Sequence, residues 1–193
     1  ASPILPPIPG AQLDGVFKVR TPDDAIALRE HAKANGCRRA VVVGGGFIGL
    51  EMAENLSERG LAVTVVEGAS HVMPPIDMDM AHQVHNYIRA KGLNLYLGQT
   101  CTAMDKDGVI LGNGQKIPAD MVLLSIGVRP DTAFLKDSGI EMGARGEILV
   151  NEYMETSAAD VYALGDAVST FHVVSGAKVV IPLASPANKQ GRI

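Results

Sequence analysis

The 193-residue sequence lacks several features that would each assign it to a different class of protein. It has no apolar run near the roughly 20 residues of a membrane-spanning helix, and its first residues have neither the basic nor the apolar region of a signal peptide. Its 17 basic and 21 acidic residues are mixed, which leaves a net charge of -4 and no basic stripe for nucleic acid or anionic lipid. We therefore expect a cytoplasmic globular protein with no nucleic-acid or membrane partner.

Potential metal and redox ligands are also scarce. Cys37 and Cys101 are the only cysteines, and they form no Cys-x-x-Cys pair, so we expect buried thiols rather than a redox or zinc site. His82 and His85 stand three residues apart on an expected helix with Asp79 nearby, but the spacing offers no further ligand. We interpret them as a solvated helix face and predict no metal site.

Glycine, in contrast, is concentrated directly after an apolar stretch, in VVVGGGFIGLEMAENL at residues 41–56. The pattern predicts a buried strand over Ala40–Val43 and a helix over Gly46–Arg59 that Gly60 ends. A second strand is expected over Leu61–Glu67. These three elements form one βαβ unit.

Three glycines in this stretch have the spacing Gly-x-Gly-x-x-Gly. The first permits a tight turn, the second lets the backbone approach a pyrophosphate, and the third lets helix and strand pack closely. The helix N-terminus adds backbone N–H groups and a partial positive charge, so an anion is bound without a basic side chain. The sequence therefore predicts a dinucleotide-binding loop formed by Gly44, Gly46, Phe47, Ile48 and Gly49.

Glu67 ends the second strand, where a carboxylate accepts the adenosine-ribose hydroxyls of NAD. A 2'-phosphate at about 4 Å would face a repulsion on the order of 4 kcal/mol at an effective dielectric near 20, before screening. No Lys or Arg follows in GASH, residues 68–71. We therefore expect NADH to be preferred over NADPH. Two alternatives remain. An FAD-binding unit also ends its second strand in glutamate, so the unit could bind only FAD. Alternatively, Glu67 could be an exposed residue at the end of a strand with no ligand.

The remaining elements complete an α/β fold. Thr21-Pro22-Asp23-Asp24 opens a helix that Gly36 can end, and a further helix is expected at about Met78–Lys91. Strands follow at 93–97 and 120–127, and Asp107-Gly108 and Asn113-Gly114 mark two hairpins between them. We predict a Rossmann-like, doubly wound parallel sheet with a three-stranded antiparallel meander as an insert.

Both ends of the chain look unfinished. The first 19 residues are rich in proline and show no periodicity, so we expect them to need another domain to lie on. At the other end, Ser185 is expected to cap a helix with Pro186 in its first turn, and we infer that the sequence is a piece of a larger protein. A short apolar strand is expected before Gly165-Asp166.

Four stretches together resemble the pyridine nucleotide-disulfide oxidoreductases, in which an NAD domain is inserted into an FAD domain. They are PPIPGAQLDGVFKVRTPDDAIAL, VVVGGGFIGLEMAENL with VTVVE, SIGVRPDTAFL and TSAADVYALGDAV. The resemblance implies an FAD-domain crossing at 1–20, an NAD(H)-binding domain at 21–150 and a returning FAD segment at 151–193. IPLASPANKQGRI points to the branch of NADH oxidases, NADH peroxidases and coenzyme A-disulfide reductases, with the reductases favoured.

The resemblance also implies roles for single residues. Asp166 would bind the ribityl chain of FAD, unless it only caps the end of a strand, and backbone near Ala184 and Ser185 would approach the flavin. Phe47 would gate the nicotinamide pocket, although core packing is an equal alternative. Glu51 would lie near the nicotinamide and the flavin edge, unless it is an ordinary surface charge. Backbone at Ile126 and Gly127 would contact the nicotinamide.

The implied activity is hydride transfer from NADH through FAD to a cysteine-based redox centre. Neither cysteine of this chain matches the family's redox cysteine, so we expect the chain alone to be inactive. The intact protein is expected to be a homodimer that uses a small disulfide, oxygen or peroxide as acceptor. A nonenzymatic dinucleotide-sensing module is the alternative from a different class.

Overall fold

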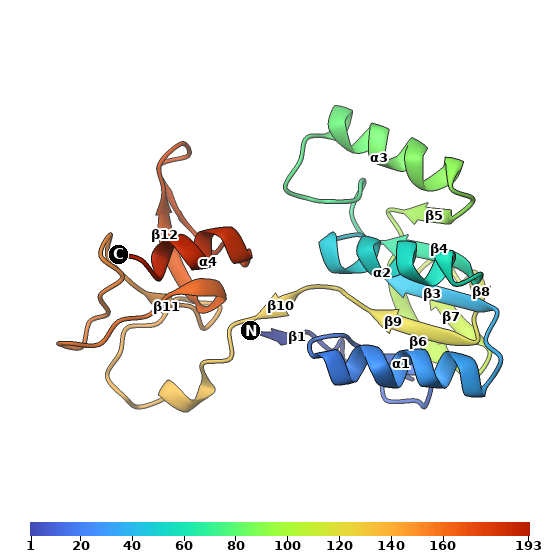
Figure 1. Cartoon of the computed structure of the whole chain (residues 1–193), viewed down its shortest axis with the longest axis horizontal. Coiled ribbons are helices and arrows are strands. Elements are labelled where there is room, and N and C mark those ends of the chain that lie inside the picture. Colours follow the sequence, from blue (N-terminus) through green and yellow to red (C-terminus); the bar gives the residue numbers. More distant parts are fainter. The chain divides into compact units, whose positions relative to one another are not determined.

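A five-stranded parallel sheet forms the centre of the larger of two units in the chain (Figure 1). The computed structural model describes residues 1–193. All four neighbouring strand pairs are parallel, and Val41 pairs with both Thr64 and Val122. The central strands are mostly apolar, as expected for a sheet that is covered on both faces. The strand order is β2 (Val16–Phe17), β9 (Met121–Leu124), β3 (Arg39–Val43), β4 (Ala62–Glu67) and β5 (Asn94–Leu97).

Three helices connect these strands, and their ends follow the sequence signals. α1 (Pro22–Ala34) begins at Thr21, whose side chain forms a capping box with Asp24. α2 (Phe47–Glu58) follows Gly46, and α3 (Met78–Ala90) joins β4 to β5. Helices α1 and α2 cover one face of the sheet. There they form an apolar core in which Leu28, Ala53 and Leu56 of the helices pack with Val42, Val65 and Leu123 of the strands.

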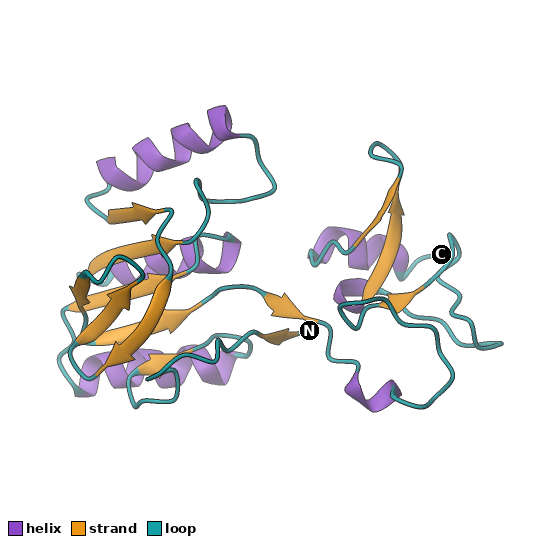
Figure 2. Ribbon diagram, turned by 180° about the vertical axis from the view of Figure 1, so that it is seen from behind, coloured by secondary structure: helices purple, strands orange, loops and turns teal.

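The predicted meander covers the opposite face, as Figure 2 shows from behind. It consists of β6 (Cys101–Asp105), β7 (Gly108–Leu111) and β8 (Lys116–Pro118), all antiparallel. Its Met104, Val109, Leu111 and Ile117 pack against sheet residues that point away from α1 and α2, including Val41, Val43, Val66 and Leu124. The predicted parallel α/β sheet with a three-stranded insert is therefore confirmed.

The proline-rich N-terminal segment differs from expectation, because it does not need another domain to lie on. Residues 3–17 cross the meander, where Met104 N–H donates to Pro9 O at 2.8 Å, and Ala11 is buried in the same core. The segment then enters the sheet as β2, which pairs with β9. A strand too short to show periodicity gave no sequence signal for this placement.

The smaller unit comprises Ala1–Ser2 and Val128–Ile193, with a core that includes Ile148, Val150, Met154 and Val168. The larger unit is Pro3–Gly127. The predicted domain boundaries at residues 20 and 150, and the assignment of these segments to FAD and NAD domains, stay predictions. The smaller unit's elements are β10 (Val128–Arg129), η1 (Ala133–Leu135), β11 (Ile148–Leu149), η2 (Gly165–Ala167), β12 (Val168–His172), β13 (Ala177–Val179) and α4 (Ala184–Gln190); β1 (Ser2–Pro3) pairs with β10.

Two local expectations in the smaller unit are wrong. Ser185 does not cap the last helix: α4 starts two residues earlier than expected, at Ala184 with Leu183 at the cap position, and no side chain caps it. The expected apolar strand before Gly165 is only an isolated bridge between Glu155 and Tyr162, since no neighbouring strand extends along it. No helix of the chain is both long enough and apolar enough to cross a bilayer.

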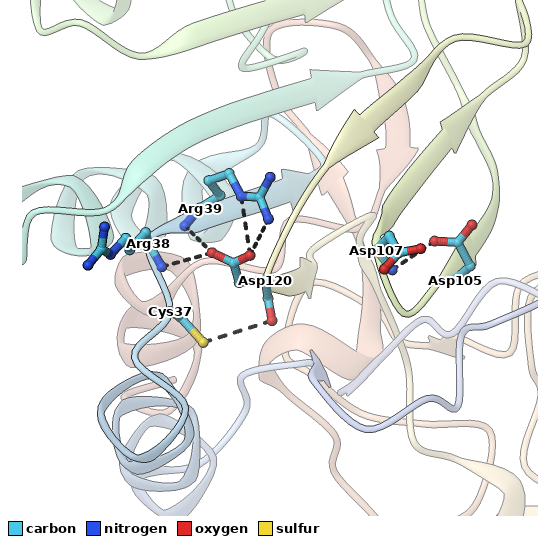
Figure 3. Close-up of polar contacts among 6 residues, drawn as sticks. All are labelled: Cys37, Arg38, Arg39, Asp105, Asp107 and Asp120. Carbon is cyan, nitrogen blue, oxygen red and sulfur yellow. Dashed lines mark hydrogen bonds and ion pairs between the residues drawn. The ribbon is translucent and has the colours of Figure 1, made fainter.

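The Asp120 carboxylate joins the amino ends of the neighbouring strands β3 and β9 (Figure 3). Asp120, just before β9, accepts the backbone N–H groups of Arg38 and Arg39 at 2.9 Å each, and the Arg39 guanidinium donates to its second oxygen. Cys37 Sγ lies 3.8 Å from Asp120 O. The Arg39 side chain and the two backbone donors lower the pKa of Asp120 to about 2. The strand pair β3–β9 is thereby locked in register at its start.

Replacing Asp120 with Asn should destabilise the chain at neutral pH by about 1–2 kcal/mol, a value reduced for solvent screening. Because folding lowers this pKa from its usual 3.8, the stabilisation is complete above about pH 4 and is lost as the pH falls toward about 2. Denaturant unfolding of both proteins across this range measures the difference. Asp107→Asn is the matched control, since that side chain is 64% exposed and pairs only with Lys116 at 3.6 Å. An equal cost for both substitutions would contradict the prediction.

Candidate functional site

The predicted dinucleotide loop lies at the carboxyl ends of β3, β4 and β9, opposite Asp120. Gly44 N–H donates to Val66 O on β4 at 2.8 Å, and Ser125 N–H, after β9, donates to Val43 O at 2.8 Å. The loop is therefore held between both neighbours of β3. The carboxyl edge of a parallel sheet is where ligands bind in this class of fold.

The three motif glycines meet different surroundings. Gly44 has φ +112°, and a Cβ there would lie 2.3 Å from Ser125 O. A Cβ on Gly49 would lie 2.0 Å from Gly44 O, so α2 packs directly on the backbone that leaves β3. A Cβ on Gly46 would meet no atom within 4 Å. The first and third glycines are thus required by the chain itself, whereas the second leaves open space.

The open space at Gly46 lies at the N-terminus of α2. Gly46 is the cap residue, no side chain caps the helix, and its first turn has no acidic residue. Phe47 and Ile48 at the start of the helix are 43% and 44% exposed. The first backbone N–H groups therefore have no side-chain acceptor, and the helix dipole adds a partial positive charge there. This arrangement suits a phosphate or pyrophosphate group.

Glu67 lies beside the loop, and its carboxylate already contacts two backbone groups. Oε2 accepts Gly45 N–H at 2.6 Å, and Oε1 accepts Ala69 N–H at 2.7 Å. An ionised carboxylate has about four acceptor sites, so each oxygen can accept a further bond from a ribose hydroxyl. The structure thus gives Glu67 a task that the motif does not reveal: it orients the glycine loop.

The sequence analysis missed the role of one residue of the site, Ser125, and misread another, His85. Ser125 Oγ lies 3.1 Å from both Val43 O and Gly44 O and fastens the turn after β3. Its place directly after a buried strand was the available signal. His85 is 2% exposed, and its Nε2 accepts Val72 N–H at 3.2 Å. The interpretation of His85 as part of a solvated helix face is therefore wrong, because the loop before α3 folds back over it.

The residues expected near the nicotinamide are exposed parts of the same unit. Phe47 and Glu51 line an apolar groove of about 250 Å³ between α2 and α3, together with residues such as Tyr87 and Ile88. Ile126, after β9, is 40% exposed, and Gly127 O accepts Ile4 N–H at 3.0 Å. Their roles toward a ligand stay predictions.

The residues expected near FAD belong to the smaller unit. Asp166 lies in η2, half-buried, while Ala184 and Ser185 are exposed at the start of α4. Gln190 of α4 accepts Gly165 N–H at 2.8 Å and so ties α4 to η2. This bond places Asp166 and the first turn of α4 within one small substructure.

Neither cysteine has the environment of a reactive thiolate. Burial raises the pKa of Cys37, with a contribution from Asp120, and burial also raises the pKa of Cys101. Cys101 Sγ contacts Ala103 O at 3.5 Å. A thiol with a raised pKa is a poor nucleophile at neutral pH. A depression of about 750 Å³ borders Cys37 at the amino end of the strands and contains none of the predicted site residues.

Comparison with known proteins decides the family. Residues 1–191 match the family described as pyridine nucleotide-disulphide oxidoreductase. The chain belongs to this family. An NADH oxidase of Methanocaldococcus jannaschii is 40% identical over 100% of the chain, and a CoA-dependent NAD(P)H sulfur oxidoreductase of Pyrococcus abyssi is 37% identical over 100%. The chain covers 44% of the length of each relative.

A solved structure of an NADH oxidase has the same fold as this chain. The water-forming NADH oxidase of Lactobacillus brevis, bound to NADH, is 34% identical, with a TM-score of 0.89. The match covers 98% of this chain and 42% of that one. The predicted resemblance to the oxidoreductase family is thereby confirmed, while the roles of individual residues are not tested by it.

The surroundings of the glycines in this chain predict different effects of two substitutions on the free energy of unfolding. Gly49→Ala should destabilise the chain by about 2 kcal/mol or more, because the new Cβ meets a backbone oxygen that cannot move aside. Gly46→Ala should stay within about 1 kcal/mol of the unmodified chain, since its φ of -78° and the open space both accept a methyl group. Denaturant unfolding measures both. Equal losses of stability would contradict the assignment of separate roles.

Proposed function

We propose that the chain is the NADH-binding part of a flavin-dependent oxidoreductase, in which hydride passes from NADH through FAD to a cysteine-based redox centre. The observation that carries the proposal is the open space at Gly46, in front of the uncapped N-terminus of α2. Gly44 and Gly49 are held by close backbone packing on either side of it. Membership of an oxidoreductase family supports the reaction class.

In this proposal the larger unit binds and orients NADH. Backbone N–H groups at the start of α2 hold the pyrophosphate next to Gly46, and the Glu67 carboxylate accepts the adenosine-ribose hydroxyls. Phe47, Ile48 and Glu51 lie further along α2, and Ile126 and Gly127 follow β9, where they would contact the nicotinamide half. Fixing the reactive carbon in one orientation and excluding water are the contributions of these residues to hydride transfer.

The smaller unit is proposed to hold FAD through Asp166 and the backbone at Ala184 and Ser185. The half-buried Asp166 carboxylate makes no hydrogen bond within the chain, so it is available to a ribityl hydroxyl. FAD, when bound, supplies the ring that accepts two electrons and passes them on. The chain's own thiols are protonated and unsuited to the last step, so the redox cysteine is expected outside these 193 residues.

The proposed acceptors are a small-molecule disulfide, oxygen or peroxide. The names of the two relatives, an NADH oxidase and a CoA-dependent sulfur oxidoreductase, support acceptors of the oxygen and sulfur classes. A cytoplasmic location and a homodimer stay predictions from the sequence.

Calorimetric titration of the chain with NADH, NADPH and FAD tests the proposal. NADH should bind at least about tenfold more tightly than NADPH, a difference of about 1.4 kcal/mol. Glu67→Gln should narrow this difference, because it removes the charge that repels a 2'-phosphate. The amide can accept only one of the two backbone N–H groups that Glu67 accepts, so the ratio of the two affinities, and not either affinity alone, measures the effect of the charge. Binding of FAD alone would assign the loop to a flavin and overturn the proposal. NADPH binding as tight as NADH binding would overturn the role of Glu67.

Gly46→Ala should weaken NADH binding by about tenfold or more while leaving stability nearly unchanged, since its methyl group would occupy the space assigned to the pyrophosphate. Gly60→Ala is the matched control: that glycine follows the other end of α2 and has no ligand role. A Cβ on Gly60 would meet no other atom, but its φ of +86° is unfavourable for alanine. Gly60→Ala should therefore lower the free energy of unfolding and leave the dissociation constant of NADH unchanged. Unchanged NADH affinity in Gly46→Ala would contradict the assigned pyrophosphate position.

A further inference from the structure

The segment between β4 and α3, residues 68–77, folds back onto the glycine loop (Figure 1). Met73 N–H donates to Gly45 O at 2.8 Å. Val72 is completely buried, and its Cγ1 lies 2.8 Å from the position that a Cβ on Gly45 would take. Gly45 is therefore held by Met73 through its carbonyl and by Glu67 through its N–H group. Any displacement of Val72 and Met73 would reach the dinucleotide loop directly.

His85 on α3 is the anchor of this segment. Its Nε2 accepts Val72 N–H at 3.2 Å, although the side chain is 2% exposed. Only an unprotonated Nε2 can accept that bond, so the neutral imidazole carries its proton on Nδ1. A protonated ring would present a donor to the Val72 N–H, leaving two donors opposed in a buried site.

The basic groups near His85 oppose a second proton. His82 lies on the same helix with its ring centroid 5.6 Å away, Arg89 is one turn further along, and His71 belongs to the segment itself. Glu67, at the end of β4, already accepts bonds from Gly45 and Ala69. Burial and these basic neighbours lower the pKa of His85.

We propose that His85 is a positioning residue for the dinucleotide site: its neutral imidazole holds Val72 and Met73 against Gly45, and protonation of His85 weakens dinucleotide binding. The proposal rests on the NADH-binding function proposed above. Binding favours the neutral form of His85, so by linkage a bound dinucleotide lowers the proton affinity of this residue. The folded chain therefore keeps its affinity at neutral pH and loses it as the pH falls through the lowered pKa of His85.

ADP-ribose is a suitable probe, because it contains the adenosine ribose and pyrophosphate but no hydride donor. Its dissociation constant is measured by calorimetry from about pH 8 to about pH 5. For the unmodified chain we expect nearly constant affinity at the upper end and a loss of about tenfold at the lower end. His85→Gln offers an uncharged amide oxygen to Val72 N–H, so its affinity should match the chain at high pH and stay nearly constant as the pH falls.

Two further variants separate positioning from general effects. His85→Leu fills the site but offers no acceptor to Val72 N–H, so at every pH it should bind ADP-ribose about fivefold or more weakly than the unmodified chain does at high pH. His85→Gln should restore the affinity that His85→Leu loses. His82→Gln tests the neighbouring charge, because that ring is exposed on the same helix and opposes protonation of His85. This variant should keep the affinity of the unmodified chain at high pH and begin to lose it at a slightly higher pH than the unmodified chain does. Thermal unfolding of each variant verifies that it is folded.

The outcomes are distinguishable. The same pH dependence in His85→Gln as in the unmodified chain overturns the role of His85. A pH dependence that instead disappears in His71→Gln assigns the effect to His71 and also overturns the proposal. If folded chains bind ADP-ribose at no pH, the proposed dinucleotide-binding function fails, whatever the state of His85.

Discussion

The site depends on one close backbone contact, in which Gly49 of α2 rests on the carbonyl of Gly44. Because a Cβ at Gly49 would lie 2.0 Å from that oxygen, only glycine lets the helix approach the end of β3 this closely. The same approach points the uncapped N-terminus of α2 at the open space beside Gly46. The close packing at Gly44 and Gly49 thus leaves an open space beside Gly46, and the helix N-terminus makes this space favourable for an anion.

Segments distant in sequence stabilise this short loop. Ser125 fastens the carbonyl oxygens of Val43 and Gly44, Glu67 accepts Gly45 N–H, and Met73 donates to Gly45 O. All three reach the loop because the sheet places β3 between β9 and β4. The opposite end of the sheet has a different task, since its Asp120 is fully occupied in aligning β3 with β9. The parallel sheet therefore has one end that joins strands and one end suited to a ligand.

The family assignment and the geometry support each other at different levels. Membership of the pyridine nucleotide-disulphide oxidoreductases gives the reaction class, and the chain spans less than half the length of the relatives named above. The geometry supplies a physical reason for a nucleotide site in the larger unit. The raised thiol pKa values of Cys37 and Cys101 explain why this part of the molecule is proposed to deliver reducing equivalents rather than to carry the redox centre.

By itself, the sequence determined the helices of the larger unit, the parallel βαβ unit, the hairpins of the meander and the positions of Gly44, Gly46 and Gly49. These follow from local rules of periodicity, capping and turn formation, which neighbouring residues express. Only the tertiary structure decided that the N-terminal segment joins the sheet, that Glu67 holds Gly45, and that His85 is buried under the segment before α3. Each of these depends on contacts between residues far apart in the chain, and such pairings leave no periodic pattern in a single sequence.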